Sequence, residues 1–370
     1  MVAKFIGRFP HAAYVSSRSS LIVASAFAAG LAGIAGSAAP AHALTIVPTF
    51  DSTITSNSNA AYYEADINNA ITAIDSYIAN PVQVSIDFQN MSTGLGQSNT
   101  NYNSLSYSNS VSNLQSNPTP STYQTTADAT LPGTNTVPGN NSSNVDITLP
   151  LLRALGHSNL GNNNGGLDST ISLNLSDMNL NRTSPQNPSK YDLQAVAAHE
   201  IDEVLSIGGS GSNLSTNTTT NQIGDIRPLD LFRFSGNGVR SYNPSTSISS
   251  YFSINGGQSN LVYFNQNGST DGSDFGDWGN GVVPAEAQPN NPPQVQDAYG
   301  DPGIAGPNLG SNELTALNVV GWNLTPAGLA AVPEPATWGL LAIGAIGLLA
   351  RRRTGSWGQC SLGGDDGGRT

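Results

Sequence analysis

The apolar positions along the chain predict a helix followed by a strand near the start of the main folded region. Within Ala60–Ile78, apolar residues recur at spacings of three and four, which is the period of one helical face. Asn80 and Pro81 follow and are expected to end the helix. Apolar and polar residues then alternate over Val82–Phe88, the pattern of a half-buried strand.

The remaining pattern completes an α+β fold, with a mixed or antiparallel sheet, an N-terminal helix and a central helix. A helix beginning at Tyr191 is expected to be cut off by a Gly/Ser-rich turn that ends at Gly211. Residues 90–144 are rich in Ser, Thr, Asn and Gly and are expected to form a surface excursion with one or two edge strands. The alternating segment 167–175 predicts a strand shortly before the central helix. Further strands are expected at 44–50, 145–149, 251–257 and 261–265, the last two as a hairpin, and a closing helix at 313–320.

The first 43 residues have the three parts of a secretion signal in order. Lys4, Arg8 and Arg18 form a positive region, Leu21–Ala35 is apolar, and 41–43 read Ala-His-Ala, a small-x-small cleavage site. We therefore expect an exported protein whose mature chain begins at residue 44.

The other end of the chain also carries a targeting pattern. Val332–Pro335 reads VPEP, Ala336–Ala350 is apolar, and Arg351–Arg353 is a basic cluster. This order resembles the PEP-CTERM sorting signal, which implies processing by an exosortase and delivery to the cell envelope or the extracellular space. The apolar segment is expected to anchor the chain transiently as a transmembrane helix, with the arginines on the cytoplasmic side. We divide the remainder into a domain at 44–326, the sorting signal at 327–353 and a tail at 354–370.

Composition narrows the classes of function. The net charge of −12 argues against nucleic-acid binding, which requires basic patches. The single cysteine, Cys360, lies beyond the arginine cluster, so the exported portion has no disulfide and no cysteine ligands for zinc.

The helix at 191–205 carries the strongest chemical signal. His199 and Glu203 are four residues apart and share one helical face, with Glu200 beside them. This is the geometry of the HExxH zinc-peptidase helix, with a glutamate in place of the second histidine. The spacing assigns His199 and Glu203 as metal ligands and Glu200 as the general base. Asp202 is a substitute ligand or a supporting group.

A catalytic metal site needs a third protein ligand from elsewhere in the chain. Outside the signal peptide the only histidines are His157 and His199, so an all-histidine site is excluded. The metzincin pattern would place a ligand at Gly209, which has no side chain to offer. The order of preference is Asp230, then Asp225, then His157.

Zinc is the expected metal of an HExxH-like helix, and carboxylates can bind it at distances similar to those of histidine. A site with two carboxylates also shifts the metal preference toward calcium or manganese. The alternative is that His199, Glu200 and Glu203 bind no metal and form a hydrogen-bonded helix face.

A second acidic cluster, Asp271-x-x-Asp274-x-x-Asp277, could bind calcium but is favoured as plain turns. The aromatic residues Trp278, Tyr299 and Trp322 are expected in the core rather than on a polysaccharide.

Four segments in a consistent order resemble a group of zincin-like metallopeptidases found among PEP-CTERM proteins. They are AHEIDEVL at Ala198–Leu205, PLDLFRFS at Pro228–Ser235, FSINGG at Phe252–Gly257 and ELTALNVVGW at Glu313–Trp322. The resemblance implies an α+β zincin domain, a turn under the metal at Pro228–Ser235 and a closing helix at Glu313–Trp322.

Carried over by position, the resemblance makes His199 a metal ligand, Glu200 the base and Asp230 a possible third ligand. Two positions depart from the family pattern: Glu203 replaces the second histidine, and Ser206 stands where a glycine usually follows.

Two hypotheses follow. The first is an exported metallopeptidase that hydrolyses the peptide bonds of a protein or peptide substrate. The second is a non-catalytic envelope or extracellular-matrix protein on a degenerate zincin scaffold, active in adhesion or biofilm, with exopolysaccharide as a candidate partner.

Overall fold

A computed structural model describes residues 43–332, apart from 136–143, 158–165, 181, 183–186, 210–213, 215–225, 244, 268–273, 285 and 287. The predicted signal peptide up to residue 42, the apolar segment 336–350 and the tail 354–370 lie outside the described residues. No helix in the described part of the chain is long and apolar enough to cross a membrane.

A four-stranded mixed sheet forms the first half of the fold. Its order is β1 (Thr45–Phe50), β2 (Gln83–Asn90), β6 (Ser169–Leu173) and β3 (Gly96–Thr100). The first three strands run parallel and β3 pairs antiparallel to β6. Val84, Ile86 and Phe88 alternate with less buried residues along β2, as the period-two pattern predicts. The α+β class and the mixed sheet are thus confirmed.

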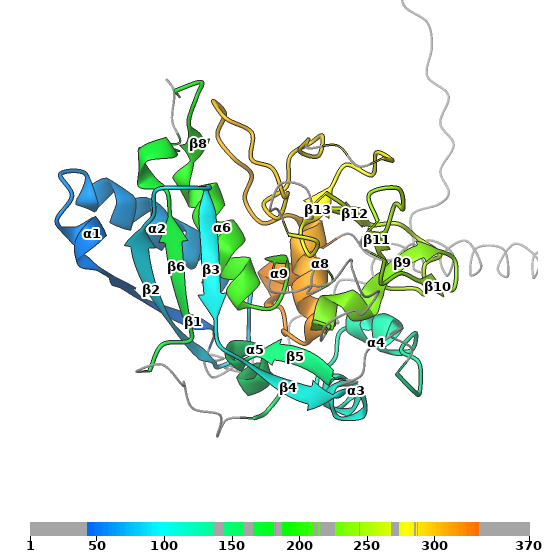
Figure 1. Ribbon diagram of the computed structural model, residues 1–370. Coiled ribbons are helices and arrows are strands. Elements are labelled where there is room, and N and C mark those ends of the chain that lie inside the picture. The colour runs from blue at the N-terminus through cyan, green and yellow to red at the C-terminus, as the bar shows by residue number, and fades with distance from the viewer. Residues whose placement is uncertain are drawn as a thin grey trace, which may run out of the picture. The chain divides into compact units, whose positions relative to one another are not determined.

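Two helices pack together beside this sheet, α2 (Ala60–Asp75) and α6 (Leu193–Val204) (Figure 1). The buried face of α2 is the one expected from its three- and four-residue spacing, although the helix ends at Asp75 rather than Ile78. α6 contacts β3 and β6, and the Asp192 side chain caps it by accepting hydrogen bonds from the N–H groups of Gln194 and Ala195.

A second sheet of five short antiparallel strands follows α6 in the chain. Its order is β10 (Val239–Arg240), β9 (Arg233–Gly236), β11 (Tyr251–Phe252), β12 (Val262–Phe264) and β13 (Trp278–Gly279). The predicted hairpin is confirmed by the antiparallel register of β11 and β12.

Helix α8 (Ser311–Val320) lies between the first half of the fold and the second sheet, and nearly all of its side chains are buried. Immediately after it, the indole N–H of Trp322 donates to the Leu205 carbonyl at the end of α6, 2.8 Å away. From the second sheet, the indole N–H of Trp278 donates to Glu313 at the start of α8. Both tryptophans are buried, as predicted.

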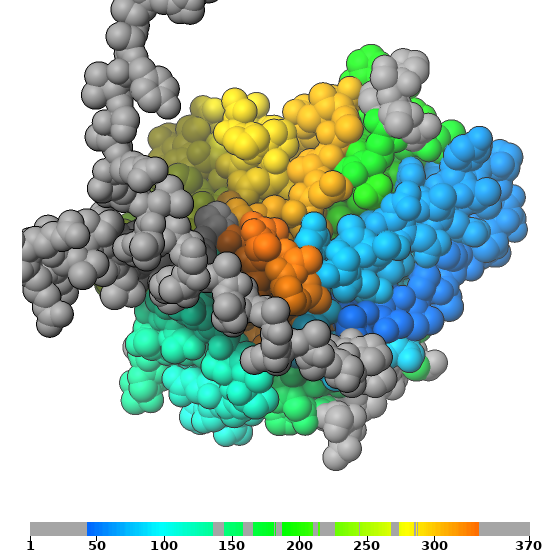
Figure 2. Space-filling model, turned by 180° about the vertical axis from the view of Figure 1, so that it is seen from behind, coloured from blue at the N-terminus to red at the C-terminus, as the bar shows by residue number. Residues whose placement is uncertain are grey.

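The C-terminal end of the described chain lies beside the C-terminal end of α2, where the Thr325 N–H donates to the Tyr77 carbonyl (Figure 2). A helix, α9 (Pro326–Ala331), spans the boundary that we expected between the domain and the sorting signal. The remaining elements are α1 (Ser52–Thr55), β4 (Tyr102–Ser106), α3 (Tyr107–Gln115), α4 (Thr122–Asp128), β5 (Asn144–Thr148), α5 (Leu149–Ala154), η1 (Leu175–Asp177), β7 (Met178–Asn179), β8 (Tyr191–Asp192) and η4 (Pro228–Phe232).

The region before α6 matches the sequence expectation in part. Within the described part of 90–144, the expected edge strand is present as β3, but α3 and α4 also form there and contact the core, so this part is not only a surface excursion. The strand expected over 167–175 is confirmed as β6, which lies between β2 and β3 with Ile171 and Leu173 fully buried and is not at the edge of the sheet. The sequence of β3, GQSNT, has no apolar alternation that would locate it.

Replacing Trp322 with Phe tests the link between α6 and the closing helix. The variant leaves the buried Leu205 carbonyl without its indole donor, which is expected to lower the free energy of unfolding by about 1–3 kcal/mol. Chemical denaturation would measure this, with the exposed Tyr62→Phe variant as the control. An unchanged unfolding free energy in Trp322→Phe would contradict the link.

Candidate metal centre

Helix α6 presents His199 and Glu203 on one face, as the spacing predicts. The Nε2 atom of His199 lies 3.6 Å from Oε1 of Glu203. The carboxylate of Glu203 also accepts hydrogen bonds from the Ser98 hydroxyl on β3, at 2.5 Å, and from the Gly209 N–H, at 3.1 Å. Strand β3 and the turn after α6 therefore hold this carboxylate facing the histidine.

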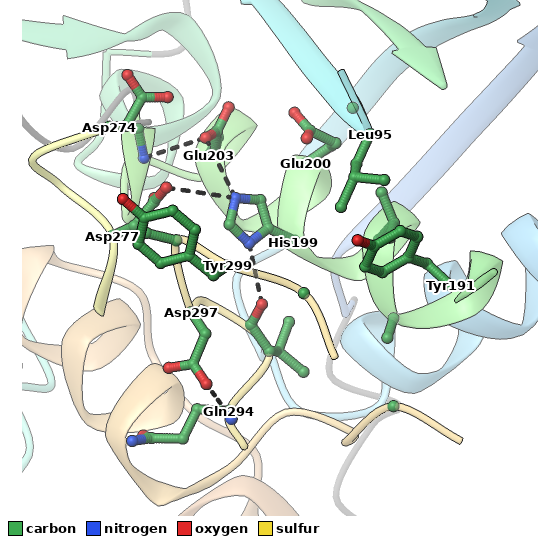
Figure 3. A pocket seen from close by; sticks show the side chains of 18 of the residues that line it. Leu95, Tyr191, His199, Glu200, Glu203, Asp274, Asp277, Gln294, Asp297 and Tyr299 are labelled. Carbon is green, nitrogen blue, oxygen red and sulfur yellow. Dashed lines mark hydrogen bonds and ion pairs between the residues drawn. The ribbon is translucent and has the colours of Figure 1, made fainter. Parts of the chain in front are cut away.

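The third donor comes from the residue just before β13. Oδ2 of Asp277 lies 3.7 Å from Nε2 of His199, on the side opposite the helix backbone (Figure 3). One ligand atom from each of His199, Glu203 and Asp277 lies within 4.8 Å of the others. Donors at such separations can contact one cation, because zinc binds nitrogen and oxygen at about 2.0–2.2 Å.

The expected third ligand, Asp230, is not part of this group. It lies in η4, fully buried, and its Oδ2 accepts a hydrogen bond from the Arg227 N–H at 3.0 Å. Asp230 therefore supports the turn that begins η4. The other candidates do not join the group either: His157 follows α5 and is absent from it, and Asp225 lies outside the described residues.

The second acidic cluster and the helix motif, treated as separate in the sequence, meet in one place. Asp274 and Asp277 both line the same cleft as His199, Glu200 and Glu203. Asp271 lies outside the described residues. The run of aspartates in front of Trp278 was the signal that could have identified Asp277, but its spacing alone favoured plain turns.

The ring of His199 is oriented by a hydrogen bond on its far side. Nδ1 lies 2.9 Å from the Val295 carbonyl, which can only accept, so Nδ1 is the donor. In the neutral imidazole, Nε2 then directs its lone pair toward Glu203 and Asp277, as a metal-binding histidine requires. The side-chain amide of Gln296 also reaches this point, 3.2 Å from Nε2 of His199 and 3.0 Å from Oδ1 of Asp277.

Glycines leave room for the carboxylates. A Cβ at Gly96 on β3 would lie 2.2 Å from Oε1 of Glu200. A Cβ at Gly209 would lie 2.2 Å from Oε1 of Glu203 and 2.6 Å from Oδ2 of Asp274. Any larger residue at these positions would displace the acidic groups from the cleft.

Ser206 has a backbone conformation that glycine adopts more readily than other residues. Its φ of 75° is in the left-handed region, and its hydroxyl lies 2.7 Å from that of Thr148 on β5. This hydrogen bond helps to hold the turn that ends α6.

Burial and mutual repulsion raise the pKa values of the carboxyls around His199. Burial raises the pKa of Glu200 well above its usual range, and the neighbouring Glu203 adds to this. Burial likewise raises the pKa of Asp277 well above its usual range and that of Asp274 to about 6. Burial alone would lower the pKa of His199, but the charges of Asp277, Glu203 and Glu200 raise it well above its usual value.

The donor set suits a cation. Buried carboxylates are normally paired, bound to a metal or protonated. Oε2 of Glu200 is buried and has no hydrogen-bond partner among the described residues. One histidine and several acids with few basic partners form a site in which a divalent ion would replace protons.

The group opens into a cleft of about 690 Å³ between α6, β3 and the loop at 293–307. Leu95 and Tyr191 lie on the far side of Glu200 from the acidic residues, and Tyr299 lies in front of the histidine (Figure 3). The structure thus places Tyr299 in the cleft rather than in the core.

Comparison with known families finds one match, the PEP-CTERM protein-sorting motif, over residues 331–353. The motif implies an exported, envelope-associated protein that is processed by an exosortase, as the sequence predicted. No curated protein matches the chain. No solved structure matches it either.

Replacing Asp277 with Asn tests whether Asp277, rather than the expected Asp230, completes the candidate metal site. The variant loses the negative charge of a proposed ligand, so its affinity for zinc or manganese should fall by at least about a hundredfold. Loss of a residue that only hydrogen-bonds a metal ligand costs about tenfold to a hundredfold. Titration calorimetry on the chelated protein would measure it, with Asp230→Asn as the matched control. Equal weakening in both variants would contradict the assignment.

Metal affinity should also fall as the pH is lowered. The pKa values of Glu200, Asp274, Asp277 and His199 are all raised, so protons compete with a cation even near neutrality. Between about pH 8 and about pH 6, the affinity is expected to drop by roughly tenfold or more. A flat affinity over this range would show that these groups do not bind the ion.

Proposed function

We propose that the chain is an exported metal-dependent hydrolase that cleaves peptide bonds. The observation that carries the proposal is the convergence of His199, Glu203 and Asp277 next to Glu200 in an open cleft. Such a site needs three protein ligands, an accessible position and a neighbouring base, and these residues can supply each of them.

A bound metal would supply a water of lowered pKa and polarise the scissile carbonyl. Glu200, which lines the cleft beside His199 and Glu203, would accept the proton of that water and pass it to the leaving amine. Burial raises the pKa of Glu200 well above its usual range, which makes its carboxylate a stronger base than an exposed one. His199 and Glu203 are held by β3, by the turn after α6 and by Val295, so little reorganisation is needed.

Strand β3 supports a peptide as the substrate. It is the last strand of the first sheet, and Gly96, Gln97 and Ser98 line the cleft beside Glu200 and Glu203. An extended peptide can add to such an edge through main-chain hydrogen bonds, which would lay a peptide bond across the metal centre.

The zincin scaffold and the metal are part of the same proposal. Zinc is the first candidate, and calcium and manganese are the alternatives, since one histidine with two carboxylates forms a harder donor set than two histidines. The extra negative charge also reduces the Lewis acidity available for hydrolysis. Secretion through the sorting signal, with transient anchoring by 336–350, would place the enzyme where it meets extracellular protein.

One observation favours a non-catalytic role on the same scaffold. His199 and Glu203 have hydrogen-bond partners without a metal, in Gln296, Ser98 and Gly209. A helix face satisfied in this way would serve a matrix or adhesion protein, with exopolysaccharide as its partner.

Replacing Glu200 with Gln tests the proposed reaction. The purified protein is stripped of metal, reloaded separately with zinc, manganese or calcium, and assayed on casein. Metal-dependent hydrolysis is expected for the unsubstituted protein and should fall by about 10²–10⁴-fold in Glu200→Gln, because the base is lost. The exposed Glu286→Gln variant is the control. No hydrolysis with any metal, or equal rates in all three proteins, would favour the non-catalytic role.

A further inference from the structure

Different kinds of side chain line the cleft at successive positions along β3. At the N-terminal end of β3, Leu95 and Tyr191 lie close together, since a Cβ at Gly300 would contact both side chains. Gly96 then lies against the carboxylate of Glu200, and the hydroxyl of Ser98 binds Glu203.

Beyond β3, at Tyr102 on β4, the guanidinium of Arg227 lies 4.2 Å from the centre of the tyrosine ring. An apolar end, the metal centre and a cationic end therefore follow one another.

Arg227 is the only lysine or arginine among the described residues that line the cleft, where seven acidic side chains also lie. Its side chain is 12% exposed, and its nearest acidic partner, Oδ2 of Asp146, is 4.0 Å from Nη2. That carboxylate is also bound through its other oxygen by the Ser104 hydroxyl. The buried Nε of Arg227 has no hydrogen-bond partner in the described part of the chain.

A largely buried guanidinium that lines a cleft, with a single acidic side chain 4.0 Å away, is a favourable site for a carboxylate. Charge-assisted hydrogen bonds from arginine to a carboxylate are stronger than neutral ones, and two parallel bonds also fix its orientation. The stacking on Tyr102 holds the guanidinium plane without using its N–H groups.

We propose that Arg227 forms a subsite for an acidic side chain of an extended peptide substrate. The subsite deepens the proposed function, on which it rests for the position of the scissile bond. A strand that adds to β3 in the antiparallel sense would place its N-terminal part at Arg227 and its C-terminal part at Leu95 and Tyr191. The preferred substrate then carries an acidic residue ahead of the cleaved bond and an apolar residue after it.

The chain length between the two ends sets the spacing. Leu95, at the apolar end, and Tyr102, at the cationic end, are seven positions apart, which is roughly 23 Å at about 3.3 Å per residue. Because the arginine and glutamate side chains are long and can shorten this separation, the acidic residue is expected roughly five to eight residues before the apolar one.

Binding to the full-length Glu200→Gln protein, loaded with manganese, tests the subsite without cleavage. The probes are fluorescent peptides in which one Glu stands five, six, seven or eight residues before a Phe, each paired with a peptide that has Gln in its place. Fluorescence anisotropy gives the two affinities. At one spacing, the Glu peptide is expected to bind roughly tenfold to a hundredfold more tightly than its Gln partner.

Adding Arg227→Gln should abolish this difference while leaving the affinity of the Gln peptide unchanged, and Arg227→Lys should retain part of it. Lys190→Gln removes the same charge at a residue that does not line the cleft and is the matched control. Thermal melting checks that each variant is folded.

Equal affinity for the Glu and Gln peptides at every spacing would overturn the proposal, as would a preference that survives in Arg227→Gln. If the Glu preference depends on Arg227 but the unsubstituted protein hydrolyses no substrate, the subsite is supported and the proposed reaction is contradicted.

Discussion

The structure depends most on how several carboxyl groups are kept together beside one histidine. Glu200, Glu203 and Asp277 come from a helix and a distant loop and are all buried, and burial makes the ionisation of Glu200 and Asp277 costly. Much of the surrounding architecture serves this cluster. Gly96 and Gly209 provide the space, and Ser98 with the turn after α6 provides hydrogen-bond donors.

The closing helix α8 stabilises the same arrangement from behind. Trp322 ties it to the end of α6, and Glu313 ties it to Trp278 and to the Gln296 N–H. Because Trp278 follows Asp277 directly, these contacts fix the position of the third donor relative to His199. A ligand group assembled from such distant segments is held by the packing of the core and not by a local turn.

Local sequence patterns predicted many helices and strands but did not predict which distant segments come together at the candidate site. The period of apolar residues identified α2, β2 and the β11–β12 hairpin, and the HEIDE spacing identified the helix face that carries His199 and Glu203. The sequence indicated an edge strand somewhere in 90–144 but did not locate β3, because an edge strand that borders a cleft can be polar on both faces. The sequence analysis also favoured Asp230 over Asp277 as the third ligand. Asp277 lies 78 residues after His199, and the two are brought together by sheet pairing and helix packing, which a local pattern does not reveal.

The most direct measurement of the central claim is anomalous diffraction from crystals soaked in zinc or manganese. The account predicts one strong peak within about 2.0–2.3 Å of Nε2 of His199 and of one carboxylate oxygen each from Glu203 and Asp277. A peak elsewhere in the cleft, or no peak while His199 keeps its contact with Gln296, would contradict it.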